Sequence, residues 1–188
     1  LTVSGANTYT GGSNINGGML ALGSAGAIGN AGTVSFGGGA LQFSLANATD
    51  YSARFSNAAG QAYALDTNGQ AVTLASGLSS AGGSLSKTGA GTLSLTGNNG
   101  FDGGTTVRAG TLSVGAGGAS GSLAGAVVND AALVVNRSGA ITLAGDISGA
   151  GSLDKQGTGT LTLSGNNGGY SGNITLAAGS LALGSANA

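Results

Sequence analysis

One stretch of this chain occurs three times, and that repetition constrains the fold more than any other feature. Gly83–Gly115 reads GSLSKTGAGTLSLTGNNGFDGGTTVRAGTLSVG, and Gly151–Gly184 reads GSLDKQGTGTLTLSGNNGGYSGNITLAAGSLALG. The second half of the same pattern opens the chain at Leu1–Gly23 as LTVSGANTYTGGSNINGGMLALG. Repetition on this scale indicates an architecture of stacked units.

A shorter period lies inside the repeat, because Gly91–Leu95, GTLSL, recurs as Gly110–Val114, GTLSV. The three copies align at Leu1, Leu93 and Leu161, and the number of residues between these leucines gives the offset from one copy to the next. We interpret these offsets as four and three turns of roughly 23 residues each. A short strand that recurs at this interval can pair in parallel with its own earlier copy, and such crossovers are right-handed. The sequence therefore predicts an all-β, right-handed parallel β-helix of about eight to nine turns.

Alternation within the strands predicts which side chains are buried. In Thr92–Leu95, Leu93 and Leu95 share one face and should point into the helix, while Thr92 and Ser94 face water. Glycines are expected at the corners, where the chain needs a positive φ or a close backbone approach.

Further β-type runs occur about every eight to twelve residues, as expected for a solenoid. They are Thr33–Phe36, Ala40–Phe43, Tyr51–Phe55, Gln61–Leu65, Ala71–Leu74, Ser122–Val128, Ala132–Asn136 and Ala140–Leu143. Ala31–Gln70 departs from the repeat and holds five of the eight aromatic residues, Phe36, Phe43, Tyr51, Phe55 and Tyr63. We interpret it as further turns with bulkier filling, or as a place where a side loop leaves the helix.

The repeated segment also resembles a known family. KTGAGTLSLTGNNGFDGGTTVRAGTLSVG is similar to the passenger-associated transport repeat, or autotransporter-associated β-strand repeat, of Gram-negative autotransporters. Val128–Gly165 is similar to the stretch that usually precedes this repeat. The resemblance extends over Val72–Gly115, Val128–Gly184 and Leu1–Gly29. It implies one β-helical segment, residues 1–188, of a larger secreted or cell-surface passenger, with repeat units at 1–29, 72–115 and 141–184.

The composition excludes several functions. The 188 residues include 41 glycines but no cysteine, histidine, tryptophan or proline, and the net charge is −1. The basic residues lie far apart in the sequence, which argues against nucleic acid; they are Arg54, Lys87, Arg108, Arg137 and Lys155. No apolar run approaches the roughly 20 residues that span a bilayer, so we expect no membrane insertion of this segment. Because Leu1 falls inside a repeat, we expect the chain to be an excised segment.

Repeated polar residues have structural interpretations. Asn7, Asn99 and Asn167 precede an aromatic residue in a glycine-rich loop, where asparagine often satisfies local backbone groups; the alternative is a ligand-binding loop present three times. Gly97–Asp102 faintly resembles a calcium-binding nonapeptide, but Asp102 is matched by Thr10 and Ser171, so we expect no metal site and no cofactor. Lys87 and Lys155 occupy the same repeat position, and we interpret them as exposed charges at strand ends that discourage lateral pairing.

The missing residue types also argue against catalysis. Without His, Cys or Glu, the chain cannot form a Ser-His-Asp triad or a thiol nucleophile. Two chemistries remain possible on paper: a Ser–Lys pair of Ser84 or Ser86 with Lys87, and an Asp-based glycosidase or lyase around Asp146 or Asp154. Asp154 and Lys155 are adjacent in a strand and so point to opposite faces, which suits neither chemistry. A Thr-x-Thr ice-binding face would need more copies than Thr160-x-Thr162. We therefore predict no catalytic residues and no enzyme activity.

The resemblance implies a non-catalytic stalk that aids folding and secretion of the passenger and presents a distal functional region. Its expected partners are the protein's own β-barrel translocator, outside this segment, and adjacent β-helix turns. The expected location is extracellular, at the bacterial cell surface. The alternative is an adhesin module that binds host or neighbouring cells through exposed loops or through residues 31–70.

Overall fold

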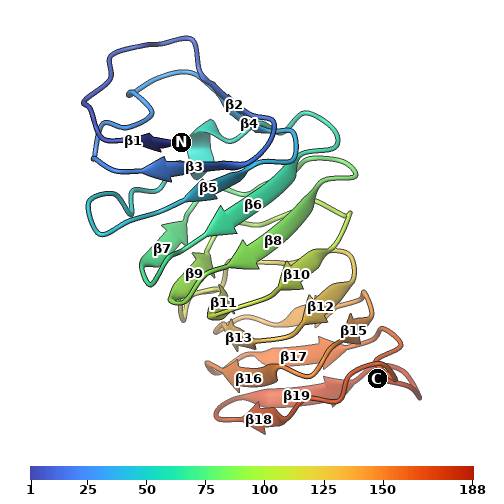
Figure 1. The fold of residues 1–188 in the computed structure, drawn as a ribbon. Helices are drawn as coiled ribbons and strands as arrows, with labels where there is room; N and C mark the ends of the chain where they lie inside the picture. Colours follow the sequence, from blue (N-terminus) through green and yellow to red (C-terminus); the bar gives the residue numbers. More distant parts are fainter.

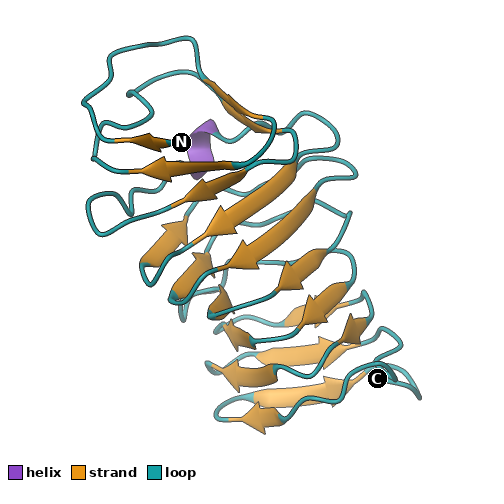
Figure 2. Ribbon diagram, in the orientation of Figure 1, coloured by secondary structure: helices purple, strands orange, loops and turns teal.

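The computed structural model, which describes residues 1–188, is a β-solenoid of about nine turns with almost no helix (Figures 1 and 2). All strand pairs between its named strands are parallel, so the predicted parallel β-helix is confirmed. The chain winds from the N-terminal turn at one end of the stack to the C-terminal turn at the other (Figure 1).

Two long sheets form two sides of the solenoid. The eight-stranded sheet receives one strand from each of the first eight turns, in the order β1 (Thr2–Val3), β3 (Met19–Leu22), β5 (Ala40–Gln42), β6 (Ala62–Asp66), β8 (Ser84–Thr88), β10 (Thr105–Val107), β12 (Val127–Asn129) and β15 (Ile147–Ser148). The six-stranded sheet contains β7 (Ala71–Leu74), β9 (Thr92–Leu95), β11 (Thr111–Val114), β13 (Ala132–Asn136), β16 (Ser152–Gln156) and β18 (Ile174–Leu176).

The third side carries two shorter sheets. Near the N-terminus lies the pair β2 (Ser13–Ile15) and β4 (Val34–Phe36), and near the C-terminus lie β14 (Ile141–Leu143), β17 (Thr160–Leu163) and β19 (Ser180–Leu183). Strands β2, β4 and β14 each lead directly into a strand of the eight-stranded sheet, which places both short sheets on the same side.

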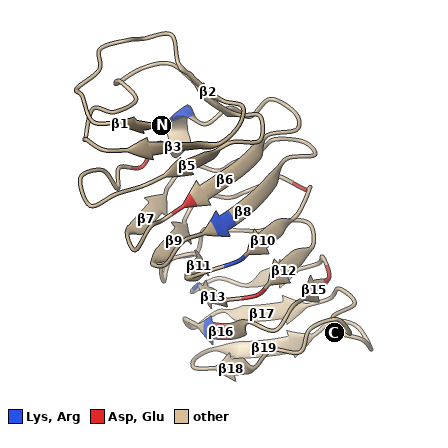
Figure 3. Cartoon of the chain, viewed as in Figure 1, with Lys and Arg blue, Asp and Glu red and all other residues tan.

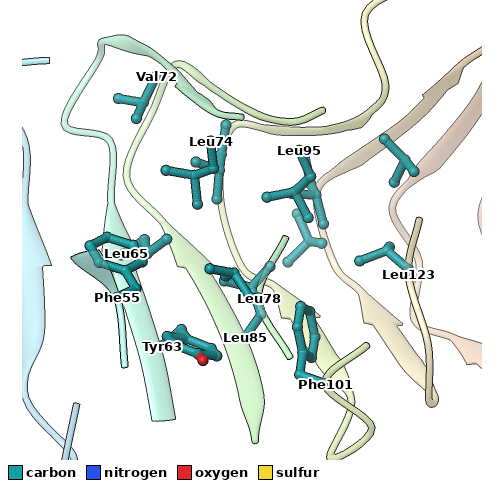
Figure 4. Close-up of a cluster of buried hydrophobic side chains, with 14 of the residues drawn as sticks. Phe55, Tyr63, Leu65, Val72, Leu74, Leu78, Leu85, Leu95, Phe101 and Leu123 are labelled. Atoms are coloured by element: carbon teal, nitrogen blue, oxygen red, sulfur yellow. The ribbon is translucent and has the colours of Figure 1, made fainter. Parts of the chain in front are cut away.

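The interior is a column of inward-pointing apolar side chains. Leu93 and Leu95 of β9 are fully buried, and their ladder partners in β11 are Leu112 and Val114, which are also fully buried. Thr92 is only half-buried, on the opposite face of the strand. The predicted alternation is therefore confirmed. In Figure 4 the ladder partners Leu74 and Leu95, from successive turns, lie next to each other among the other buried side chains.

Residues 31–70 form regular turns with bulkier filling, since β4, β5 and β6 all join sheets of the solenoid. Phe36 packs edge-on against Phe55 and Tyr63, with ring centroids 5.0 and 5.5 Å apart, and Tyr63 packs against Phe101 of a later turn at 6.1 Å. A short loop, Ser44–Asn47, also leaves the surface, and its Leu45 is 91% exposed. The region therefore contains further turns with bulkier filling and also a short loop, so each of the two interpretations describes part of it.

Two of the expected strands are absent or shortened. Tyr51–Phe55 was expected to be a strand, but Ser52–Arg54 is a 3-10 helix, because the Asp50 carboxylate accepts a hydrogen bond from the Ser52 amide (2.8 Å) and favours a turn there. In Ser122–Val128, only Val127 and Val128 belong to a strand, since Ser122 instead bonds to Asn99 of the preceding turn.

The spacing of the repeats differs from the predicted whole numbers of turns. In the eight-stranded sheet, β8 is the fourth strand after β1. The strand of the second copy that matches β1 is β9, which follows β8 in the chain and lies on the next side of the solenoid. In the six-stranded sheet, β16 is the third strand after β9. The strand of the third copy that matches β9 is β17, which follows β16 and again lies one side further on. The second copy therefore lies four turns and about a third of a turn after the first, and the third copy lies three turns and about a third of a turn after the second.

Matching residues of the three copies consequently point in three different directions. The equivalent strands β1, β9 and β17 lie in the eight-, six- and three-stranded sheets respectively. The prediction was wrong on this point because most turns are shorter than the period that it assumed: Thr111 in β11 aligns with Ala132 in β13, and Ala132 aligns with Ser152 in β16.

Substitution of adjacent residues in β9 tests this packing. Leu93→Asp should lower the free energy of unfolding by more than about 4 kcal/mol, because it places an unpaired charge in the core. Thr92→Asp, its matched control, should cost less than about 1 kcal/mol. Urea titration followed by circular dichroism measures both values, and similar costs for the two variants would contradict the assignment of faces.

Candidate functional site

The repeat lysines are buried inside the solenoid, contrary to the prediction that they are exposed charges at strand ends. Lys87 and Lys155 have no solvent-exposed surface. Lys87 Nζ donates to the carbonyl oxygens of Thr88 (2.9 Å) and Gly89 (2.7 Å) in its own turn, and to that of Ala109 (3.0 Å) in the next turn. The ammonium thus joins two turns through their backbones.

Lys155 makes the same three contacts in the later copy. Its Nζ donates to the carbonyl oxygens of Gln156 (2.6 Å), Gly157 (2.8 Å) and, in the next turn, Ala178 (3.2 Å). Because β16 lies in the six-stranded sheet and β8 in the eight-stranded sheet, the same arrangement occurs on two different sides of the solenoid.

A signal for this burial was present in the sequence. In Ser84–Thr88, SLSKT, Lys87 comes two residues after the buried Leu85 and therefore shares its inward face. Sequence reasoning missed it because lysine is seldom fully buried unless it is paired, and the backbone carbonyls that satisfy it come from corners that only the fold brings together.

Glycines at those corners provide the space for each ammonium. Gly110 has φ +66°, and a Cβ built on it would lie 2.9 Å from Lys87 Nζ. Gly179, with φ +71°, stands in the same relation to Lys155 Nζ, also at 2.9 Å. Burial lowers the pKa of Lys87 to about 8, although the Asp66 carboxylate favours the charged form; burial also lowers the pKa of Lys155.

The repeated asparagines also join successive turns. Asn99 Nδ2 donates to the carbonyl oxygens of Gly97 (3.0 Å) and Ser122 (2.9 Å), and its Oδ1 accepts from the Leu78 amide (2.9 Å). Asn7 Nδ2 similarly donates to Gly5 and, in the next turn, to Ala27. These contacts fit the structural interpretation of the asparagines, since each satisfies backbone groups of its own and a neighbouring turn.

Asn167, in the last copy, has only part of this pattern. Its Oδ1 accepts from the Ile147 amide of the preceding turn (2.7 Å), while its Nδ2 is buried without a partner. The side chain of this copy therefore binds the turn before it and makes no hydrogen bond to the turn after it.

Two arginines bind the carbonyls of earlier turns. Arg54 donates from Nε to Gly32 (2.8 Å) and from its terminal nitrogens to Gly29, Ile28 and Ala31, and it lies 5.6 Å from the centroid of the Tyr51 ring. Arg137 donates to Gly121 (2.6 Å) and Ala119. Four of the five basic side chains are therefore held by backbone carbonyls, which leaves Arg108 exposed on the outer surface.

Carboxylates bind backbone amides in the corresponding way. Asp102 Oδ1 accepts from Gly82 of the preceding turn (2.6 Å), and Asp146 Oδ1 accepts from Asn166 of the next turn (2.7 Å). Asp50 accepts from Ser52 and, with its second oxygen, from Ala75 (2.9 Å). Figure 3 shows that the charged residues are spread along the stack rather than gathered on one face.

The structure does not bring the considered catalytic residues together. Ser84 and Ser86 lie on the outer face of β8, whereas Lys87 points inward and all three of its donors are directed at carbonyl oxygens. Lys155 is likewise buried, on the opposite face from Asp154.

A shallow outer groove of about 320 Å³ lies across β8, β10 and β12. Its lining includes Ser86, Thr106, Arg108 and Val128, together with Gly103 and Gly104. This groove is the part of the outer surface where the one exposed basic side chain meets several hydroxyl groups.

Comparison with known proteins gives a match to one family and a match to part of one protein, but no match to a solved structure. The passenger-associated-transport-repeat family matches residues 1–22, 85–114 and 153–183. The chain is also 53% identical over 53 residues to the protein named adhesin BmaC autotransporter from Brucella suis biovar 1 (strain 1330). That match spans 28% of this chain and only 2% of the relative. No solved structure matches the chain, and no helix in the structure is long and apolar enough to cross a membrane.

The lysine contacts predict an unusual pH dependence. The pKa of Lys87 is about 8 in the folded chain, below the ordinary value of 10.5, so the unfolded chain holds the proton more tightly between these values. The free energy of unfolding should therefore increase as the pH rises from 7.5 to 9.5. Urea titrations across this range should show a smaller increase in Lys87→Met and the full increase in Arg108→Met, and an unchanged profile in Lys87→Met would contradict the assignment.

The asparagine contacts predict a difference between two neighbouring residues. Asn99→Ala removes two donated and one accepted hydrogen bond at a buried position and should cost about 3 kcal/mol. Asn98→Ala removes one weaker bond at an exposed position, to the Gly121 amide (3.2 Å), and should cost less than about 1 kcal/mol. Thermal or urea unfolding of the two variants distinguishes an asparagine that stabilises the fold from a surface asparagine that is available only for binding a ligand.

Proposed function

We propose a structural role for this chain, which is a segment of an autotransporter passenger carrying three passenger-associated transport repeats: it is a non-catalytic stalk that supports folding and secretion of the passenger and presents a distal functional region. The stalk would lie at the cell surface or outside the cell. Its partners would be adjacent β-helix turns and a translocator domain elsewhere in the protein.

One observation carries this proposal. The three copies of the repeat lie on successive sides of the solenoid, yet Lys87 and Lys155 make the same turn-to-turn contacts, and Asn7 and Asn99 each bind the turn that follows. A binding function shared by the copies would be expected to place their matching surface groups side by side. What the copies share is instead the way in which one turn stacks on the next, which supports a stalk.

The physics of stacking links such contacts to secretion. In a solenoid each turn contacts only its neighbours, so folding can begin at one place and spread to adjacent turns. A repeat that holds its own turn and the following one with several hydrogen bonds provides a template for that spreading. The low charge and the absence of cysteines would also suit passage of the unfolded chain through a narrow pore.

An adhesin module is the second candidate. It is favoured by the name of the Brucella relative and by the outer groove that contains Arg108 and the hydroxyl groups of Ser86 and Thr106. Leu45, at the tip of the loop in the region between the first two repeats, is a further exposed contact point.

Two deletions in the parent passenger separate these roles. Removing Gly151–Gly184 eliminates the third repeat. Removing Ala40–Tyr63 eliminates one turn outside the repeats and lets Ala64 take the ladder position of its partner Ala40. For the stalk, the first deletion should reduce the amount of exported, protease-resistant passenger, while attachment to host cells per exported molecule stays unchanged after both deletions.

The outcome that contradicts the stalk is normal export and normal protease resistance with lost attachment. Such a loss after removal of Ala40–Tyr63 would assign binding to the region between the first two repeats. Such a loss after removal of Gly151–Gly184 would assign it to the third repeat. Surface immunoblotting and a cell-attachment assay, normalised to the exported protein, give the two readouts.

A further inference from the structure

We infer that Lys87 and Lys155 determine which turn of the chain stacks next to the repeat that contains them. In this role each lysine is a positioning residue for folding. The inference goes beyond the stalk function, because it would hold whatever the passenger does.

The apolar strands by themselves discriminate poorly between neighbouring turns. In β9, Leu93 and Leu95 face Leu112 and Val114 of β11, and the strand after β11 offers the similar pair Leu133 and Val135. A stack in which one turn loops out would therefore keep much the same hydrophobic column. Strands with interchangeable side chains specify their pairing weakly.

Lys87 breaks this equivalence. Its ladder partners on either side, Leu65 and Val107, are apolar and offer no side-chain acceptor. The ammonium obtains two carbonyls from its own corner, and its third acceptor is the Ala109 carbonyl at the corner of the next turn, at 3.0 Å.

The following turn does not offer an equivalent corner. Val107 pairs with Asn129 and Thr111 pairs with Ala132, so the three corner residues Arg108–Gly110 are matched by only two, Asp130 and Ala131. A Cβ at the position of Gly110 would lie 2.9 Å from Lys87 Nζ, and the shorter corner, Asp130–Ala131, has no glycine. The Ala131 carbonyl already accepts a hydrogen bond from the Ser152 amide (2.8 Å). If β12 replaced β10 beside β8, the ammonium would meet a shorter corner without glycine and the Asn129 side chain in place of Val107, so the contact with the Ala109 carbonyl would not be reproduced.

The second copy has the same arrangement in a different sheet. Lys155 lies between the apolar Val135 and Leu176, and its third acceptor is Ala178, followed by Gly179 with φ +71°. The pairing of an inward lysine with an alanine-glycine corner about one turn later is thus a property of the repeat, independent of the side on which it lies.

A buried charge is well suited to this task. Burying an ammonium contributes little to stability, because the loss of hydration offsets its hydrogen bonds, but leaving it unsatisfied is costly. The lysine therefore penalises wrong arrangements more than it stabilises the right one, which is how specificity arises between similar alternatives.

Introduced cysteine pairs can report which turns are adjacent, because the chain has no cysteine of its own. Ser86 and Thr106 are ladder partners, so Ser86→Cys/Thr106→Cys reports the native stack. Val128 lies one strand further on, so Ser86→Cys/Val128→Cys spans two strand spacings, roughly 9.6 Å, and cannot form a disulfide unless β10 is omitted. Each pair is refolded from urea with and without Lys87→Met and then oxidised, and the crosslinked fraction is measured by mass spectrometry.

In the Lys87 background, we expect the Ser86–Thr106 pair to crosslink and the Ser86–Val128 pair to stay reduced. Lys87→Met should raise the Ser86–Val128 crosslink at least five-fold while shifting the Tm of the protein by no more than about 5 °C. Arg108→Met, which removes an exposed charge from the neighbouring strand, should leave both crosslinked fractions unchanged.

Three results would overturn the inference. The first is a Lys87→Met protein that crosslinks only the native pair. The second is a Lys87→Met protein that fails to fold or loses more than about 10 °C in Tm, since the lysine would then be a stabilising contact. The third is an equal rise of the Ser86–Val128 crosslink in Arg108→Met, which would make the effect one of general destabilisation.

Discussion

The structure depends on satisfying the backbone polar groups at the corners between parallel strands. Within the sheets, each turn hydrogen-bonds to the turns before and after it, but at the corners only some of the carbonyls and amides are paired with the backbone of an adjacent turn. Buried groups of this kind need other partners. Lys87, Arg54 and Asn99 supply donors to the corner carbonyls, and Asp102 and Asp146 supply acceptors to the amides. The few charged residues of the chain are thus used mainly on its own backbone.

This use of charge explains why a composition so poor in charged residues is compatible with a long, regular stack. The ammonium of Lys155 and the guanidinium of Arg54 are satisfied by carbonyl oxygens alone. Because such contacts involve only backbone atoms of adjacent turns, they work equally well on any side of the solenoid. The repeat can therefore recur after four or three turns and a third of a turn, on a different side of the solenoid, and still make the same packing contacts. The outer surfaces of the copies are free to differ.

Much of the fold could be predicted from particular residues. The inward position of Leu93 and the outward position of Thr92 follow from period-two alternation, and the early recurrence of GTLSL as GTLSV requires a chain that coils once per period. The rotation of the copies could not be predicted in the same way, because the turns have loops of unequal length and the offset between copies cannot be divided reliably into whole turns. The strand expected at Tyr51–Phe55 failed for a local reason, since the Asp50 side chain favours a turn there.

The sequence by itself determined the class of fold, the presence of the transport repeat and the apolar column, because these depend on periodicity and on side-chain type. Only the tertiary structure decided what the polar residues do. Lys87 is a charged residue in a strand whether its acceptors exist or not, and its burial becomes possible when the Ala109 corner arrives from the next turn. A side chain whose partners are backbone carbonyls leaves no complementary residue in the sequence, so its role is visible only when the turns are stacked.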